Sequence, residues 1–143
     1  MPYRHTQFGW VILAVIALAD VLSSVIVIAA GMAWVALLIL GGTAAVFLLL
    51  GWLTSEVDAT HLRMRFGVGI IRRNWALTRL RRADVVRNPW WIGWGVRFMP
   101  GRTVFNVSGF SAVEFETDAG KVYRIGTDDP EGLRRAITAA LER

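Results

Sequence analysis

The stretches FGWVILAVIALADVLSSVIVIA (residues 8–29) and WVALLILGGTAAVFLLLGWL (residues 34–53) decide how this chain folds. A helix of about 20 apolar residues, rising about 1.5 Å per residue, matches a hydrocarbon core of about 30 Å. The connector AGMA (residues 30–33) is short and uncharged. A cleaved signal peptide has a shorter apolar run and no second run directly after it. We therefore expect residues 1–53 to form a transmembrane helical hairpin.

The positions of arginine predict how this hairpin is oriented. The basic residues that flank the two runs are Arg4 on the N-terminal side and Arg63, Arg65, Arg72 and Arg73 on the C-terminal side. By the positive-inside rule, both termini are expected in the cytoplasm, with the hairpin in the inner (plasma) membrane. Trp10 and Trp52 would then lie near the cytoplasmic interface and Trp34 near the opposite one, as amphipathic indole rings prefer.

One carboxylate, Asp20, interrupts the first apolar run near its middle. Its functional interpretation is a proton or ion pathway, because ionisable residues inside a membrane are costly and often functional. Its structural interpretation is a hydrogen bond to Thr43, at nearly equal depth on the antiparallel helix, with Ser24 one turn from Asp20. We favour the structural interpretation. Gly41 and Gly42 allow close helix approach, either within the hairpin or between copies of the chain, so homo-oligomerisation stays open.

Residues 54–143 follow a different pattern, with a period of two. Leu62, Met64 and Phe66 alternate with Arg63 and Arg65, which predicts a half-buried strand with a basic outer face. Further short runs lie at 70–77, 80–86, 95–99, 104–108, 113–117 and 122–126, separated by turn residues. Seven short strands at intervals of about ten residues predict an antiparallel sandwich or barrel.

A single helix is expected at the C-terminal end. One of the two aspartates before Pro130 can cap it, and proline suits the first helical position. Leu133, Ile137 and Leu141 recur every four residues and form an apolar stripe. Because such a stripe has to be covered, we expect the helix to close one open end of the barrel.

This order of elements resembles the pleckstrin-homology-like (PH-like) domains that small bacterial membrane proteins carry beside transmembrane hairpins. The segments that carry the resemblance are RFG (65–67), GWGVR (93–97), VSG (107–109) and IGTDDP (125–130). The resemblance covers most of residues 56–143 and implies an α+β membrane protein with a seven-stranded, helix-capped, cytoplasmic domain. It also implies a binding or scaffold role without catalysis. The final helix lacks tryptophan and no inositol-phosphate signature is present, so phosphoinositide binding is not carried over.

The residue types needed for catalysis are scarce. The chain has no cysteine and only two histidines, His5 and His61. Thiol nucleophiles, disulfides and thiolate metal sites are therefore excluded, and no nucleophile–base pair is apparent. The pair Asp128–Asp129 is better explained as a helix cap than as a cation site. We expect no enzyme activity, no cofactor and no metal site.

Arginine and tryptophan suggest how the domain is used. The candidate contact residues are Arg72, Arg73, Arg79, Arg81, Arg82 and Arg87, followed by Trp90, Trp91 and Trp94. Such a set suits anionic phospholipid headgroups of the inner leaflet, whereas a solvated strand face with buried tryptophans is the alternative. A membrane protein partner also fits, and nucleic acid is less favoured because the domain is tethered. The sequence thus predicts a membrane-anchored binding module. The alternative is an oligomer in which Asp20 serves a proton or solute pathway regulated by the domain.

Overall fold

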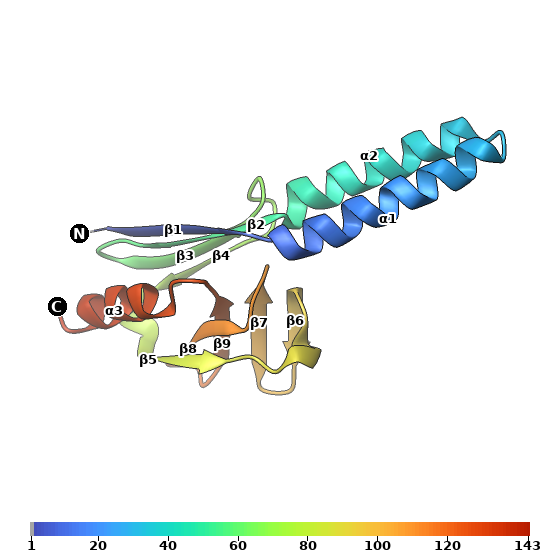
Figure 1. The fold of residues 1–143 in the computed structure, drawn as a ribbon. Coiled ribbons are helices and arrows are strands. Elements are labelled where there is room, and N and C mark those ends of the chain that lie inside the picture. Colours follow the sequence, from blue (N-terminus) through green and yellow to red (C-terminus); the bar gives the residue numbers. More distant parts are fainter. Residues whose placement is uncertain (1) are drawn as a thin grey trace.

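The computed structural model describes residues 2–143. Two apolar helices, α1 (Trp10–Ala29) and α2 (Ala33–Leu50), form a hairpin that projects from a body of two β-sheets and a third helix, α3 (Pro130–Leu141) (Figure 1). Both helices of the hairpin are long and apolar enough to cross a membrane. The α+β class and the two N-terminal apolar helices are therefore confirmed.

The first sheet is antiparallel and has the strand order β1-β2-β3-β4. Its strands are β1 (Tyr3–Phe8), β2 (Trp52–Val57), β3 (His61–Phe66) and β4 (Arg72–Ala76). Strand β1 pairs along its whole length with β2, so that Phe8 lies opposite Trp52 and Tyr3 opposite Val57. The two apolar helices are thus inserted between neighbouring strands of one sheet. The sequence pattern did not predict β1 or β2.

The second sheet has five strands in the order β5-β8-β9-β7-β6. They are β5 (Leu80–Arg87), β6 (Gly95–Met99), β7 (Arg102–Asn106), β8 (Ser111–Thr117) and β9 (Val122–Gly126). Short 3-10 turns, η1 (Leu77–Arg79) and η2 (Trp90–Ile92), precede β5 and β6. Of the two predicted arrangements, the barrel is wrong, because the nine strands within residues 2–143 form two separate sheets. The seven predicted strands are present, but they are not all antiparallel, since β7 pairs with β9 in parallel. A period of two in the sequence identifies strands and the face on which each side chain lies, but it does not show which strands pair with each other.

The core lies between the two sheets and under α3. Leu62, Met64 and Phe66 are fully buried, as their alternation predicts. The predicted apolar stripe of α3 is confirmed, because Leu133 and Ile137 are buried in the same core, although the sheets of the described residues form no barrel end for the helix to close. Asp129 accepts a hydrogen bond from the backbone N–H of Gly132 at 3.0 Å and caps the helix.

The hairpin joins the body through backbone hydrogen bonds, not through a free linker. The N–H of Gly9 donates to the carbonyl of Gly51 at 2.9 Å, and the N–H of Gly67 donates to the carbonyl of Trp52 at 2.8 Å. The N–H of Val68, in the β3–β4 turn, reaches the Leu48 carbonyl of α2 at 2.9 Å. These bonds fix the direction of the helices relative to the first sheet.

The β2–β3 turn gives a prediction for acid stability. The pKa of Asp58 is lowered from 3.8 to about 2, because its carboxylate accepts hydrogen bonds from the backbone N–H groups of Thr60 and His61. A lowered folded-state pKa contributes stability that is present above the unfolded value and lost as pH falls toward 2. We expect Asp58→Asn to lower the melting temperature in detergent at pH 7, and the gap to wild type to narrow as the pH falls from about 4 toward 2.

The matched control for this prediction is Asp84→Asn. Asp84 is exposed on β5 and lies 3.5 Å from Arg82, but within residues 2–143 no backbone N–H donates to its carboxylate as those of Thr60 and His61 do to Asp58. Its replacement should change the melting temperature at pH 7 only slightly, as exposed substitutions usually do. A gap between Asp58→Asn and wild type that stays constant from pH 7 to pH 2 would contradict the assignment.

Candidate functional site

The structure separates the arginines that the sequence places close together. Strands β1–β4 run from the base of the hairpin toward the opposite end of the body, where β5 begins beside α3 (Figure 1). Strand β3 runs from His61, at the far end of the body, to Phe66, next to Gly67 at the hairpin base, a length of about 20 Å at about 3.3 Å per residue. Ala76, at the end of β4, lies opposite His61, so Arg79, Arg81 and Arg82 come after the chain has already returned to the far end. Charges near a surface act over about 8–10 Å in physiological salt, so these three are too far from the hairpin base to share one surface with it.

Several arginines of this group already have partners in the domain. Arg79 forms an ion pair with Asp118 at 3.2 Å, and Arg82 lies 3.5 Å from Asp84. The guanidinium of Arg87 lies 5.7 Å from the centre of the Phe110 ring, in a cation–π contact. The single basic face that the sequence suggested is therefore divided between the two sheets.

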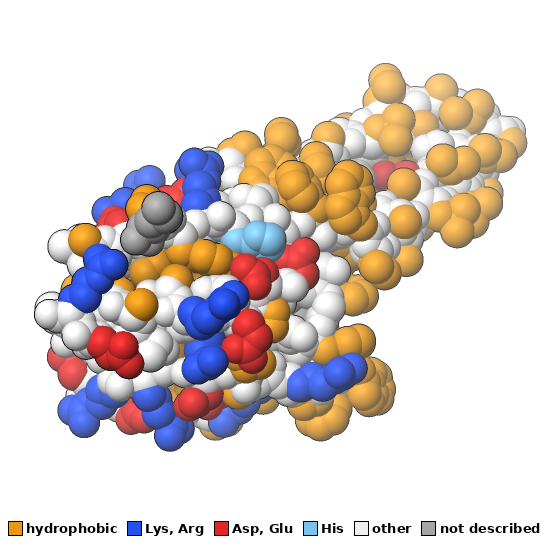
Figure 2. Space-filling view, turned by 60° about the vertical axis from the view of Figure 1, so that its left-hand side comes forward, with side chains coloured by type: hydrophobic (Ala, Val, Ile, Leu, Met, Phe, Trp, Pro, Cys, Tyr) orange, Lys and Arg blue, Asp and Glu red, His pale blue; other side chains and the backbone are white. Residues whose placement is uncertain are grey.

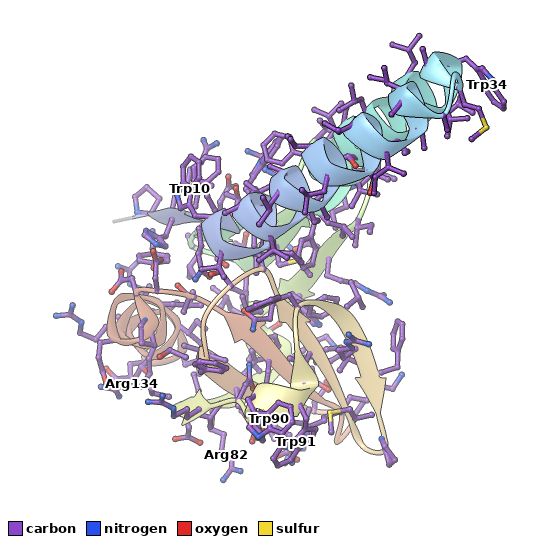
Figure 3. The ribbon with its side chains drawn as sticks, turned by 45° about the vertical axis from the view of Figure 1, so that its right-hand side comes forward. Trp10, Trp34, Arg82, Trp90, Trp91 and Arg134 are labelled. Atoms are coloured by element: carbon purple, nitrogen blue, oxygen red, sulfur yellow. The ribbon has the colours of Figure 1, made fainter. Side chains whose placement is uncertain are left out.

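The tryptophans also separate. Trp90 and Trp91 are 78% and 67% exposed, so they are not core residues. In Figure 3 both point outward from the body. Trp94 is half-buried and, with Thr43, lines a small apolar cavity of about 90 Å³ between the hairpin base and the domain. The tryptophan of the core is Trp75, which the sequence did not single out.

The exposed tryptophans belong to a larger apolar surface. Phe98 is 76% exposed on β6, and Met99 follows it. We call Trp90, Trp91, Phe98 and Met99 the apolar ridge. Strand β6 is the edge strand on the side toward which the hairpin projects, while α3 and both chain ends lie on the opposite side (Figure 1). Figure 2 shows hydrophobic side chains gathered at the lower right of the body, on the side of the helices.

A second apolar group flanks the hairpin at the β3–β4 turn. Val68 and Ile70 are 58% and 73% exposed. The hydrogen bond from Val68 to Leu48 places this turn beside the last turn of α2. Trp10 lies at the base of the hairpin and Trp34 at its tip, as expected for the two ends of a spanning pair (Figure 3). Exposed apolar groups therefore lie at the base of the helices, in this turn and in Trp10.

A basic groove lies on the outer face of the first sheet. It has a volume of about 720 Å³, and its lining includes Arg63, Arg65, Arg72 and Arg73, with Glu56 as the acidic member. Arg65 lies directly opposite Arg72 in the strand register. Of these four, Arg72 and Arg73 were candidates from the sequence. Arg63 and Arg65 were recognised as the outer face of a strand and as basic residues that flank the hairpin, but not as contact candidates.

The polar residues of the hairpin do not form the predicted contact. No hydrogen bond joins Asp20 to Thr43 in the part of the chain that the structure describes. Thr43 instead lines the apolar cavity beside Ile16 and Phe47. The Ser24 hydroxyl is buried and has no hydrogen-bond partner among residues 2–143.

Comparison of the chain with protein-family models, with curated proteins and with solved structures found no match.

Proposed function

We propose that this protein is a membrane-anchored, non-catalytic binding module of the bacterial plasma membrane, with a PH-like domain. In this proposal α1 and α2 span the bilayer and both chain ends are cytoplasmic. The observation that carries it is the uncovered apolar surface of the hairpin: no residue of α1 and only Ala36 of α2 is buried. A helix that is apolar on all sides has to be covered by protein or by lipid. The domain covers only the hairpin base, so lipid is the better cover.

The apolar ridge and the β3–β4 turn support a domain that lies against the leaflet. Large exposed apolar patches on monomers mark interaction surfaces, and an uncovered apolar edge strand favours aggregation. The ridge occupies the edge strand β6, on the side toward which the helices project. Indole rings such as those of Trp90 and Trp91 suit the headgroup region. One bilayer would therefore cover the hairpin, the ridge and the turn together.

The proposal changes which residues are expected at the leaflet. Trp90 and Trp91 stay contact candidates, together with Arg72 and Arg73 near the hairpin base. Arg79, Arg81 and Arg82 lie at the far end of the body and would remain in the cytoplasm, where they are available to a protein partner. A binding role is favoured over catalysis because the exposed surfaces offer apolar and basic contacts.

One specific observation favours a second candidate function, a proton or solute pathway through an oligomer. Asp20 forms no hydrogen bond or ion pair with any residue from 2 to 143. In a homo-oligomer, its carboxyl could bond to another copy of the hairpin or line a proton pathway between copies. Proton flux into liposomes that is lost in Asp20→Asn would favour this function over a simple anchor.

The test of the main proposal uses the absence of cysteine from the chain. A single cysteine at Phe98→Cys in the full chain, reconstituted in liposomes, can carry a nitroxide spin label. We expect this label to be more accessible to oxygen than to a water-soluble nickel chelate, because the ridge would lie in the interfacial region of the bilayer.

Arg82→Cys is the control, since its side chain is similarly exposed but lies near the start of β5, the strand that packs against α3. Its label should be accessible to the nickel chelate. Equal chelate access at both positions would show that the domain does not lie against the leaflet.

A further inference from the structure

We infer that the basic groove on the first sheet binds the phosphate of an anionic phospholipid headgroup, an inference that rests on the proposed membrane anchoring. The register of the sheet is its first support. The row nearest the hairpin is aromatic, with Phe8 opposite Trp52. The next row on the same face contains Thr6, Thr54, Arg65 and Arg72. Two strand residues separate the rows, about 7 Å.

This spacing matches the order of chemical groups at a bilayer surface. Aromatic rings prefer the headgroup level, and long basic side chains extend from apolar surroundings toward the polar boundary. If Phe8 and Trp52 mark the edge of the hydrocarbon region, the guanidinium groups of Arg65 and Arg72 lie at the depth of the lipid phosphates. The third row, with Arg4, Glu56, Arg63 and Asn74, lies deeper in the cytoplasm.

The second support is the unbalanced charge of the groove. Arg65 and Arg72 lie directly opposite each other, and like charges in this position destabilise a strand pair. Glu56 is 3.7 Å from Arg65, but it also pairs with Arg4 at 3.2 Å. Arg72 and Arg73 form no ion pair with any residue between 2 and 143. An anion between the two strands would relieve this repulsion.

The third support is the geometry of the donors. A guanidinium group presents paired N–H donors that match two oxygens of a phosphate. The groove, at about 720 Å³, is open and large enough to admit a headgroup. Inorganic phosphate offers the same oxygens. The position of the groove, one row from the aromatic boundary of the apolar helices, favours the lipid as the source.

The test is lipid binding to the full chain, measured by native mass spectrometry from detergent micelles titrated with phosphatidylglycerol or phosphatidylcholine. We expect wild type to bind phosphatidylglycerol more tightly than phosphatidylcholine. The double variant Arg65→Gln/Arg72→Gln should weaken phosphatidylglycerol binding about 30-fold, because each arginine near a leaflet contributes a factor of about five. The matched control is Arg81→Gln/Arg135→Gln, two exposed arginines outside the groove, which should change binding less than twofold. Unchanged phosphatidylglycerol binding in the groove variant would overturn the inference.

Three further measurements separate the remaining explanations. Without lipid, the groove variant should melt no lower than wild type, because it removes a like-charge pair; a lower melting temperature would show that these arginines serve the fold. If inorganic phosphate displaces phosphatidylglycerol at equal concentration, the groove is a site for free phosphate, and the inference that it binds a lipid is overturned. The spin label at Phe98→Cys, placed in the groove variant, should stay immersed in the bilayer. If the label stays in the bilayer but the wild-type chain shows no preference for phosphatidylglycerol, only the inference about the groove is refuted. If the label is accessible to water, the proposed function is refuted.

Discussion

Replacement of Gly67 by alanine is expected to destabilise the domain by about 3–5 kcal/mol, the range of severe backbone and packing defects. Gly67 has a φ of +47°, which L-residues with a Cβ rarely adopt. A Cβ built at this position would lie 1.9 Å from the carbonyl oxygen of Leu48, on the backbone of α2. Neither partner can move freely, because the next residue, Val68, donates its N–H to this same carbonyl.

The control for Gly67→Ala is Gly120→Ala. Gly120 also has a positive φ, +73°, but a Cβ there would meet no atom within 4 Å. Its replacement should cost about 1–2 kcal/mol, the backbone term alone. Chemical denaturation of both variants in the same detergent measures the difference, which isolates the collision at the joint between hairpin and domain. Equal losses in the two variants would show that α2 is not held against the β3–β4 turn.

The joint explains which part of the fold the sequence could predict. The apolar runs predicted helices at 8–29 and 34–53, and the structure has them at Trp10–Ala29 and Ala33–Leu50. Strand β1 was missed because Tyr3–Phe8 directly precedes a long apolar run, so these residues were interpreted as the segment that flanks a transmembrane helix. Its partner β2 lies more than 40 residues later, and only the return of the chain through the helical hairpin brings the two together. Local periodicity contains no signal for such a pairing.

The candidate site shows the same limit in a different form. Arg72 to Arg87 are neighbours in sequence, yet η1 lies between β4 and β5 and sends the later arginines to another sheet. The groove pair could have been predicted. Alternation placed Arg65 on the outer face, and a glycine turn followed by a returning strand implied an antiparallel partner. Counting residues across that turn brings Arg72 opposite Arg65.

Replacement of Trp75 by alanine should cost about 3–5 kcal/mol, as expected for a large aromatic residue removed from a core. Trp75 extends from the edge strand β4 into the space between the sheets. Its ring centre lies 5.0 Å from that of Phe115, 5.1 Å from that of Tyr123 and 6.1 Å from that of Phe105. These three residues belong to the second sheet. Loss of the indole would therefore weaken the packing that joins the two sheets.

Trp90→Ala is the control for this variant, because its side chain is 78% exposed on η2. In detergent it should change stability by less than about 1 kcal/mol, as surface substitutions usually do. Denaturation followed by the near-ultraviolet circular dichroism of the aromatic core separates the two variants. Equal losses would mean that Trp75 does not join the sheets. A large loss confined to Trp75→Ala would show that the sheets are stabilised through their own core. The apolar ridge would then remain free to contact the membrane.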